Sequence, residues 1–380
     1  MKNVVITHYV RSPFAPAYKG ELATVRPDEL AAQVISDLVK RTAVDPELIE
    51  DLILGCAFPE AEQGFNVARL ILFIADLPRS IAGTTVNRFC GSSMQSIHMA
   101  AGAIQMNAGD AFICAGVESM SRVPMTGFNP MPHPALFENY PQAYMGMGET
   151  AENLVEKYSI SRLAQDEFAV ESHRRAAQAA ADGNFDDEIV PIKDGDRLIA
   201  KDGCIRPGTT AETLGDLKPA FLENGSVTAG TSSPLTDGAA ACFVCSEEFA
   251  QAHSLPILAR IRSFAVSGCL PEIMGIGPVG ATHKALQRAG LELADMDVIE
   301  LNEAFSAQSL AVLHDLEVDM SKVNIDGGAI ALGHPLGATG ARITGKAASL
   351  LQRTGGQYAL ATQCIGGGQG IATILEKVGD

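Results

Sequence analysis

The fold is decided by the stretch Thr84-Thr-Val-Asn-Arg-Phe-Cys90-Gly-Ser-Ser-Met-Gln-Ser-Ile-His-Met-Ala-Ala101. Its apolar residues up to Phe89 are typical of a strand, and Met94, Ile97 and Ala101 then follow the spacing of a helix. A strand that turns into a helix at Cys90 is a building unit of α/β folds, in which the two kinds of element alternate along the chain.

The chain repeats this unit in its second half, at an offset of roughly 240 residues, with the loop variation expected between duplicated halves. Three segments correspond: Asp51–Gly55 with Asp297–Leu301, Val86-Asn87 with Val323-Asn324, and Asp110–Gly116 with Gln357–Thr362. Helical patterns over 29–41 and 279–289 alternate with these strands. The pattern predicts two α/β halves with mostly parallel strands that are buried on both faces.

A region of different character separates the halves. It is rich in Pro, Gly, Met and Asp, with one clear helix over 162–182 that begins after Ser161 as N-cap and stops at Gly183. We therefore divide the chain into an N-terminal half (1–120), an inserted loop domain (121–236) and a C-terminal half (237–380). A long insertion of mixed structure commonly carries binding function.

Composition excludes several classes of function. Hydrophobic residues make up 47% of the chain and charged residues 19%, a globular profile, and the net charge of −17 argues against a nucleic-acid partner. No apolar run reaches bilayer length, and the N-terminus reads as a strand rather than a signal peptide. With eight scattered cysteines, we expect reduced thiols and a cytoplasmic location. We expect no metal, because Cys242 and Cys245 lie in an apolar stretch without further ligands.

Cys90 is the first candidate for chemistry. At a strand-to-helix turn its sulfur would lie near the positive end of a helix dipole, which lowers a thiol pKa and favours the thiolate. The following Gly91, Ser92 and Ser93 leave backbone N–H groups for an oxyanion. The alternative is that Cys90 is simply a small buried hydrophobic side chain.

Three further turns, which we expect to be strand-to-helix turns like that of Cys90, carry polar groups. His334 lies between Gly333 and Pro335, held by the backbone as a general base requires, although it could merely cap a loop. Cys364 opens a glycine cluster that suggests close backbone approach to a substrate, or only a tight turn. Asn302 follows the strand that ends at Leu301 and could be an ordinary helix start. Because such turns gather at one edge of an α/β sheet, we expect all four side chains in one site.

At this point the chain resembles the thiolase family over nearly its whole length. The resemblance rests on the segments Val86-Asn-Arg-Phe-Cys90-Gly-Ser-Ser-Met-Gln, Gly116-Val-Glu-Ser-Met120, Asn302-Glu-Ala-Phe305, Gly327-Gly-Ala-Ile-Ala-Leu-Gly-His334-Pro and Cys364-Ile-Gly-Gly-Gly. It implies duplicated thiolase-type halves in a five-layered α-β-α-β-α arrangement, with an inserted loop domain that covers coenzyme A.

The resemblance also implies the role of each residue. Cys90 is the acyl-accepting nucleophile, His334 its base, and Cys364 the acid and base for the substrate α-carbon. Asn302, with a bound water, and His334 flank one oxyanion site, and the backbone N–H groups of Cys90 and Gly366 form the other. Two oxyanions arise when a 3-ketoacyl thioester is cleaved, so two donor sets are needed. Coenzyme A is a substrate, and no separate cofactor is expected.

The segments that match the family's coenzyme A and acyl contacts imply a set of binding residues. Arg206 would meet the adenine or phosphate end, and the remainder would line the pantetheine and acyl path: Leu214, Leu217, Phe221, Ala229, Ser233, Met147, Met274 and Phe305.

One position separates two branches of the family. Biosynthetic members that form acetoacetyl-CoA carry a histidine where this chain has Gly146. We therefore expect a 3-ketoacyl-CoA thiolase of fatty-acid β-oxidation, with acetyl-CoA C-acetyltransferase as the alternative. A decarboxylating ketosynthase usually has histidine in place of Asn302 or Cys364, and an inactive lipid carrier would lack one of the four polar groups. The resemblance implies a homodimer or a dimer of dimers (homotetramer).

Overall fold

Apart from a short two-stranded hairpin in the inserted region, the described strands form one ten-stranded sheet that divides into two similar halves, called the first and second sheets below. In this computed structural model, which describes residues 2–379, the first sheet has the order β4 (Ala82–Val86), β3 (Asp51–Gly55), β5 (Ala111–Ser119), β8 (Thr236–Ser246) and β1 (Val4–Arg11). The second has the order β10 (Val298–Leu301), β11 (Tyr358–Ile365), β12 (Gln369–Glu376) and β9 (Ala259–Gly268). β1 and β9 pair through two residues each, and β2 (Ala15–Pro16) pairs with β8.

The two sheets match strand by strand, so the predicted duplication is a property of the fold. β3 lies parallel to β5 as β10 lies parallel to β11. β8 and β12 then run antiparallel to their neighbours in the same way. Even the edge corresponds, because Val323 bridges Ile299 in the place that β4 takes beside β3.

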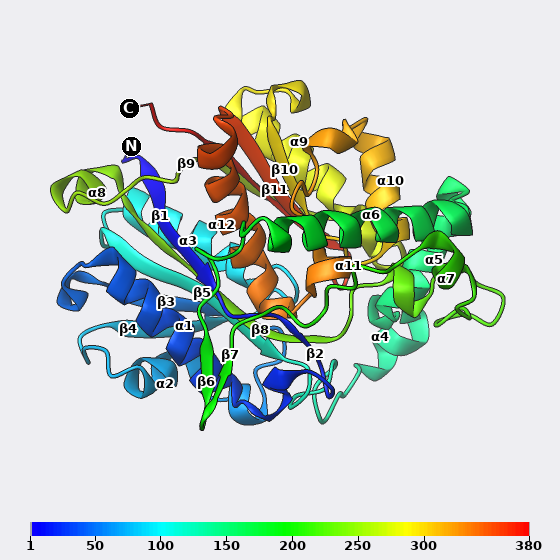
Figure 1. Cartoon of the computed structure of the whole chain (residues 1–380), viewed down its shortest axis with the longest axis horizontal. Coiled ribbons are helices and arrows are strands. Elements are labelled where there is room, and N and C mark those ends of the chain that lie inside the picture. The colour runs from blue at the N-terminus through cyan, green and yellow to red at the C-terminus, as the bar shows by residue number, and fades with distance from the viewer. Residues whose placement is uncertain (1, 380) are drawn as a thin grey trace.

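Helices cover the sheets in layers, which confirms the predicted five-layered α-β-α-β-α arrangement (Figure 1). Helices α1 (Pro27–Thr42) and α2 (Val67–Ile74) pack on the outer face of the first sheet. Helices α9 (Gly277–Ala289) and α10 (Ser306–Leu316) pack on the outer face of the second. Between the sheets lie α3 (Ser92–Gln105) and α12 (Leu336–Thr354), whose apolar residues share one core with both sheets.

The inserted region folds around the carboxyl ends of the parallel strands. It contains α4 (Pro134–Asn139), α5 (Met147–Tyr158), α6 (Arg162–Ala181), β6 (Ile192–Asp194), β7 (Arg197–Ile199) and α7 (Ala211–Gly215). The predicted start of α6 is confirmed, since the Ser161 hydroxyl accepts a hydrogen bond from the Ala164 N–H at 3.1 Å. Gly183 follows its end with φ +75°. Two short helices complete the chain, α8 (Glu247–Ala252) and α11 (Ala329–Leu332).

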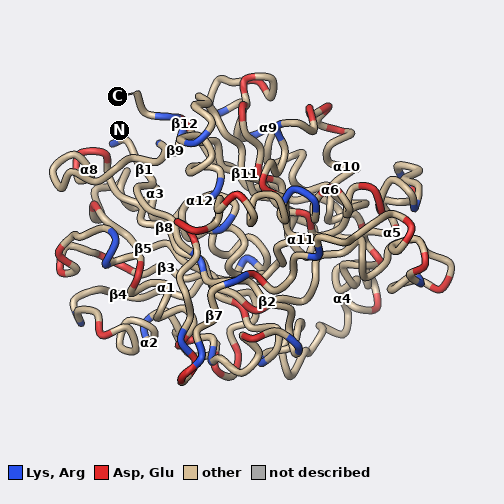
Figure 2. The backbone as a smooth tube through the Cα atoms, in the orientation of Figure 1, with Lys and Arg blue, Asp and Glu red and all other residues tan. Residues whose placement is uncertain are grey.

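Buried ion pairs tie this insertion to α12 and to β1. The Lys346 ammonium lies 3.1 Å from Glu188 and 2.7 Å from Asp326, and Arg11 bonds both Glu188 (2.8 Å) and Asp202 (2.7 Å). Oppositely charged segments lie side by side near α12 in Figure 2. Buried charges are tolerated when each is paired in this way, so the insertion is fixed to the central layer.

Two expectations about the fold were wrong. The strands are not mostly parallel, because β8 and β12 run antiparallel to both of their neighbours; β12 follows β11 through a tight turn, which can join only antiparallel strands. The boundary at 236/237 also misplaces β8, which pairs with β1 and β5 and so belongs to the first sheet. Long-range pairing of this kind leaves no local trace in the sequence.

Candidate active site

The Cys90 turn joins β4 to α3 and contains a residue with a strained backbone conformation. Phe89 has φ +43°, a left-handed conformation that costs energy for a residue with a side chain. The Ser92 hydroxyl compensates, because it accepts the Arg88 N–H at 2.9 Å and donates to the Phe89 carbonyl at 2.6 Å. The turn thereby holds Cys90 just ahead of α3, whose first residue is Ser92.

The Cys90 thiol is buried between two backbone donors. Burial raises its pKa to about 11, while the backbone N–H groups of Gly366 and of Cys90 itself pull that pKa downward. The expected lowering of the pKa was therefore wrong for the free site, since desolvation of the thiolate outweighs the helix and the donors. The thiol is the resting form, so a base must take its proton.

His334 has the protonation state that such a base needs. Its Nδ1 lies 2.6 Å from the Thr339 hydroxyl, which lies 3.1 Å from the Pro335 carbonyl oxygen. Because that carbonyl can only accept, the hydroxyl donates to it and accepts from Nδ1–H. Nε2 consequently keeps its lone pair. Burial, followed by the charge of Arg342, lowers the His334 pKa to about 3, so the imidazole is neutral at neutral pH.

Asn302 and Cys364 complete the group. The Asn302 side-chain amide lies 3.3 Å from His334 Nε2, and no residue within 2–379 bonds the Asn302 carbonyl oxygen. Burial, and next the nearby Cys90, raises the pKa of Cys364 well above its ordinary value. Only Cys90 and Asn302 occupy strand-to-helix turns as predicted: His334 lies between α11 and α12, and Cys364 precedes the β11–β12 hairpin turn.

One cavity of about 710 Å³ gathers Cys90, His334 and Cys364 on its wall. All but one of the predicted binding residues also line it. These are Arg206, Leu217, Phe221, Ala229, Ser233, Met147, Met274 and Phe305. Leu214 does not line the cavity. It is buried in the core beside Phe168, and would touch a Cβ at Gly230 from behind the wall.

A second cavity of about 500 Å³ adjoins the first. Both are lined by Cys90, Gly146, Met147 and Met274. The second is otherwise largely apolar. Gly366 and Phe89 line it together with residues outside the motifs: Phe58, Met131, Tyr144, Met145, and Met125, which also lines the first cavity. Several of these residues come from the Pro- and Met-rich stretch before α5, and that composition was the available signal.

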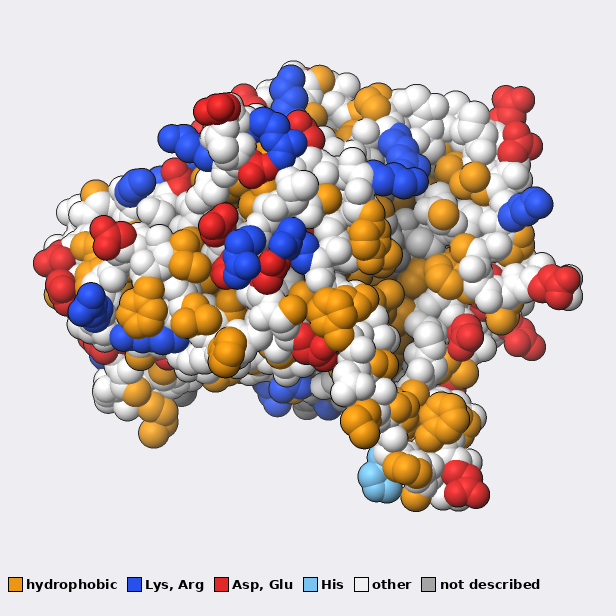
Figure 3. All heavy atoms as spheres, turned by 90° about the horizontal axis from the view of Figure 1, so that it is seen from below, with side chains coloured by type: hydrophobic (Ala, Val, Ile, Leu, Met, Phe, Trp, Pro, Cys, Tyr) orange, Lys and Arg blue, Asp and Glu red, His pale blue; other side chains and the backbone are white. Residues whose placement is uncertain are grey.

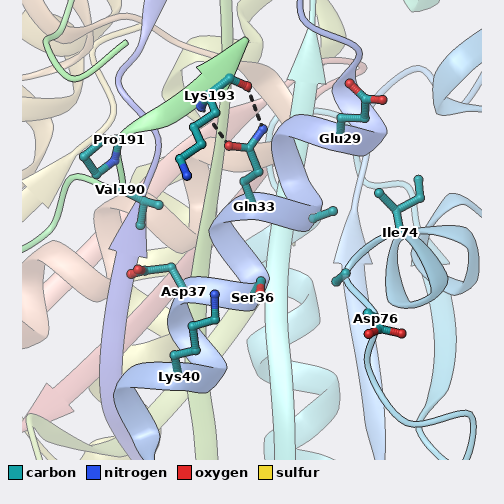
Figure 4. Close-up of a pocket in the computed structure, with 12 residues that line it drawn as sticks. Glu29, Gln33, Ser36, Asp37, Lys40, Ile74, Asp76, Val190, Pro191 and Lys193 are labelled. Atoms are coloured by element: carbon teal, nitrogen blue, oxygen red, sulfur yellow. Dashed lines mark hydrogen bonds between the residues drawn. The ribbon is translucent and has the colours of Figure 1, made fainter. Parts of the chain in front are cut away.

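Another hollow, of about 500 Å³, lies elsewhere between α1, residues 74–76 and residues 190–193 (Figure 4). Charged side chains such as Lys40, Asp76 and Lys193 line it. The Gln33 side chain bonds the Lys193 backbone twice. No cysteine or histidine lies on its wall, so it has none of the chemistry of the Cys90 cavity.

Two structural absences apply to residues 2–379. No group of three or more His, Cys, Asp or Glu side chains there could hold a metal ion. In that same part of the chain no helix is both long and apolar enough to cross a membrane.

Comparison with known proteins identifies the class of this molecule. The profile of the thiolase N-terminal domain matches residues 4–248, and that of the thiolase C-terminal domain matches residues 255–377. The chain therefore belongs to the thiolase family. The boundary between the two profiles falls after β8, in agreement with the sheet to which β8 belongs.

Particular relatives are similar over their full length. The 3-ketoacyl-CoA thiolase of Bacillus subtilis (strain 168) is 48% identical, with 99% of this chain and 100% of the relative covered. That of Marinobacter nauticus is 50% identical, with 99% of each covered. Of solved structures, the Bacillus anthracis acetyl-CoA acetyltransferase superposes with a TM-score of 0.91 at 42% identity, and the human mitochondrial 3-ketoacyl-CoA thiolase with 0.92 at 39%. Each covers 100% of this chain and 99% of its own.

Proposed function

We propose that this protein is a 3-ketoacyl-CoA thiolase, an acyltransferase that cleaves 3-ketoacyl-CoA with coenzyme A into acetyl-CoA and a shortened acyl-CoA. The observation that carries the proposal is the convergence of Cys90, His334 and Cys364 on one cavity. The full-length relatives named 3-ketoacyl-CoA thiolase support it.

The first half-reaction breaks the C2–C3 bond. His334 Nε2 takes the proton of Cys90, and the thiolate attacks C3 of the substrate. The N–H groups of Cys90 and Gly366 flank the sulfur and would receive the oxyanion that forms at C3. The bond then breaks to give acyl-Cys90 and the enolate of acetyl-CoA. Cys364 protonates the enolate carbon, while Asn302 and His334 stabilise the enolate oxygen.

The second half-reaction regenerates the enzyme. The protonated His334 first returns a proton to the Cys364 thiolate; coenzyme A then enters as a thiol, loses its proton to the neutral His334, and attacks acyl-Cys90. The acyl-CoA leaves, and the Cys90 thiolate recovers its proton from His334. Dividing the reaction through an acyl-cysteine replaces one difficult step by two easier ones.

The second cavity supports 3-ketoacyl substrates longer than acetoacetyl-CoA. It begins at the nucleophile and offers apolar side chains to a hydrocarbon tail. Steady-state thiolysis over a series from four to twelve carbons tests this. We expect kcat/KM for the longer substrates to equal or exceed that for acetoacetyl-CoA. Turnover of the four-carbon substrate alone would favour the other candidate, acetyl-CoA C-acetyltransferase, which the Bacillus anthracis structure represents.

We also propose a homodimer built on β4. Within the described chain no strand pairs with the outer edge of β4, and an open edge is a template for pairing. The α2 helix, which packs against β4, exposes Leu70, Phe73 and Ile74. Sedimentation velocity is expected to give twice the monomer mass or a multiple of it; a monomer at micromolar concentration would refute the proposal.

A dimer of dimers would need a further contact surface. The segment around α4 exposes Phe128, Met131 and Phe137. Figure 3 shows hydrophobic side chains gathered on the lobe that projects from this face. We keep the cytoplasm as the proposed location, which cell fractionation would test.

A further inference from the structure

The β11–β12 hairpin of the second half grips the Cys90 turn of the first half at three points. The Gly366 N–H faces the Cys90 sulfur. The Arg88 guanidinium donates to the Gln369 side chain at 2.9 Å. The Gln363 side-chain amide donates to the Cys90 carbonyl oxygen. The sulfur contact belongs to the oxyanion site already described; the two glutamine contacts have no part in the chemistry so far.

Gln363 lies at a special place in the strand. Its neighbours Ala361 and Ile365 belong to the central core between the sheets, whereas Cys364 belongs to the cluster that contains Met274 and Phe305. Alternate residues of a strand point to opposite faces. Gln363 therefore points toward the central core and bonds the backbone of Cys90, whereas Cys364, the next residue, points to the other face and toward the substrate.

The Gln363 contact is the most buried link of the grip. The side chain is fully buried. A fully buried amide needs hydrogen-bond partners for its polar atoms, and the Cys90 carbonyl oxygen is the partner of this one. The hydrogen bond to the Cys90 carbonyl oxygen is therefore the interaction through which Gln363 can act on the site.

The object of the grip is a strained turn. With φ +43° at Phe89, the turn tends to relax toward ordinary backbone conformations, and relaxation would move the Cys90 N–H away from the oxyanion. Contacts within the first half, such as the Ser92 hydroxyl, hold the turn against α3. They do not fix it relative to Cys364, which lies on another sheet.

We propose that Gln363 is a positioning residue that sets the spacing between Cys90 and Cys364 by holding the Cys90 carbonyl. The inference rests on the proposed roles of the two cysteines. It predicts that loss of the bond slows carbon–carbon cleavage, which needs both cysteines, more than it slows transfer of an acetyl group from acetyl-CoA to Cys90, which needs only one.

The Gln363→Met variant tests this, since methionine has a similar length and no donor. We expect kcat for thiolysis to fall about fivefold to tenfold, the value of one net hydrogen bond, with KM for coenzyme A unchanged. Acetyl transfer to Cys90 should fall less. Gln352→Met is the matched control, because that glutamine bonds only the carbonyls of Ile257 and Leu258 at the surface, and it should behave as wild type.

Gln363→Glu gives an independent readout through pH. A protonated carboxyl can donate to the Cys90 carbonyl, whereas a carboxylate only repels it. The ratio of wild-type to Gln363→Glu activity should therefore rise with pH. A role in packing alone predicts that any fall in activity with pH is matched by a loss of folded protein, which thermal unfolding of Gln363→Glu at each pH would show. This measurement needs only the glutamate variant, so it holds even where the methionine variant is unstable.

Cys90→Ser and Cys364→Ser separate the two levels of the argument. Thiolysis by either variant at near wild-type rate would overturn the proposed function. A different result would overturn the role of Gln363 and leave the proposed function standing. In that result both serine variants are inactive, Gln363→Met is within twofold of wild type, and the ratio of wild-type to Gln363→Glu activity does not change with pH.

Discussion

Replacing Gly146 with histidine should convert a broad chain-length preference into a narrow one. Gly146 precedes α5 with φ −63°, a conformation open to any residue. A Cβ built there meets only Glu149 atoms at 3.8 Å, an ordinary contact. The substitution therefore leaves the backbone undisturbed. Because Gly146 lines both cavities, the added ring would stand where an acyl chain passes from one to the other.

The size of the effect follows from the burial of the tail. A ten-carbon substrate has six more methylene groups than acetoacetyl-CoA, and at about 0.8 kcal/mol each their full burial is worth about 5 kcal/mol. Loss of half of this burial would cost about 2.5 kcal/mol, or nearly two orders of magnitude in kcat/KM. Acetoacetyl-CoA has no such tail and should lose less than threefold, roughly.

The assay is steady-state thiolysis of both substrates by wild type, Gly146→His and Gly146→Ala. The alanine variant adds one methyl group where there is room and should keep the wild-type preference. An unchanged ratio of ten-carbon to four-carbon kcat/KM in Gly146→His would refute the assignment of the second cavity to the acyl chain. An equal loss for both substrates would point to damage at Cys90 instead.

Three further predictions concern Thr339, Lys346 and the buried His98, whose Nε2 lies 2.8 Å from the Thr373 hydroxyl. Thr339→Val removes the acceptor of His334 Nδ1–H, so kcat should fall roughly tenfold to a hundredfold with KM unchanged; Thr339→Ser should restore it, and an unaffected kcat would contradict the tautomer assignment. Lys346→Met removes one partner each from Glu188 and Asp326, so the free energy of unfolding measured with denaturant should fall by about 3–5 kcal/mol. Replacing the exposed Arg41 of the Arg41–Asp37 pair with methionine should lower it by only about 0.5 kcal/mol. Burial lowers the His98 pKa to about 3, so below pH 6.5 the unfolded chain binds a proton that the folded chain refuses; stability relative to His98→Gln should fall as the pH drops from 6.5, and a constant difference would count against it.

The elements predicted correctly from the sequence are those determined by residues close together in the chain. The helical spacing after Cys90 identified α3, and Ser161 and Gly183 marked the ends of α6. The repeat identified β3 with β10 and β5 with β11, because buried strands of a duplicated unit keep their apolar pattern. The Cys90 and Asn302 turns were found in the same way.

What was missed depends on contacts between distant residues. The place of β8 is decided by pairing with β1 and β5, and that pairing leaves no pattern within β8 itself. The direction of the Cys90 pKa shift depends on how completely the folded protein excludes water from the thiol. Leu214 lies one layer behind the cavity wall, and its apolar character could not distinguish wall from core.

The contact between Gln363 and Cys90 also could not be predicted from the sequence. Next to a catalytic motif it looks like one more residue of a buried strand. Only the fold shows that its amide meets the Cys90 carbonyl across the two halves.

The most direct test of the whole account is to trap the acyl-enzyme. The protein would be mixed with a 3-ketoacyl-CoA in the absence of free coenzyme A, quenched in acid, digested and mapped by mass spectrometry. The account predicts an acyl group on Cys90 with release of acetyl-CoA, and none in Cys364→Ala, which should nevertheless accept an acetyl group from acetyl-CoA. An acyl group on Cys364, or cleavage that proceeds without Cys364, would contradict the roles assigned to the two cysteines.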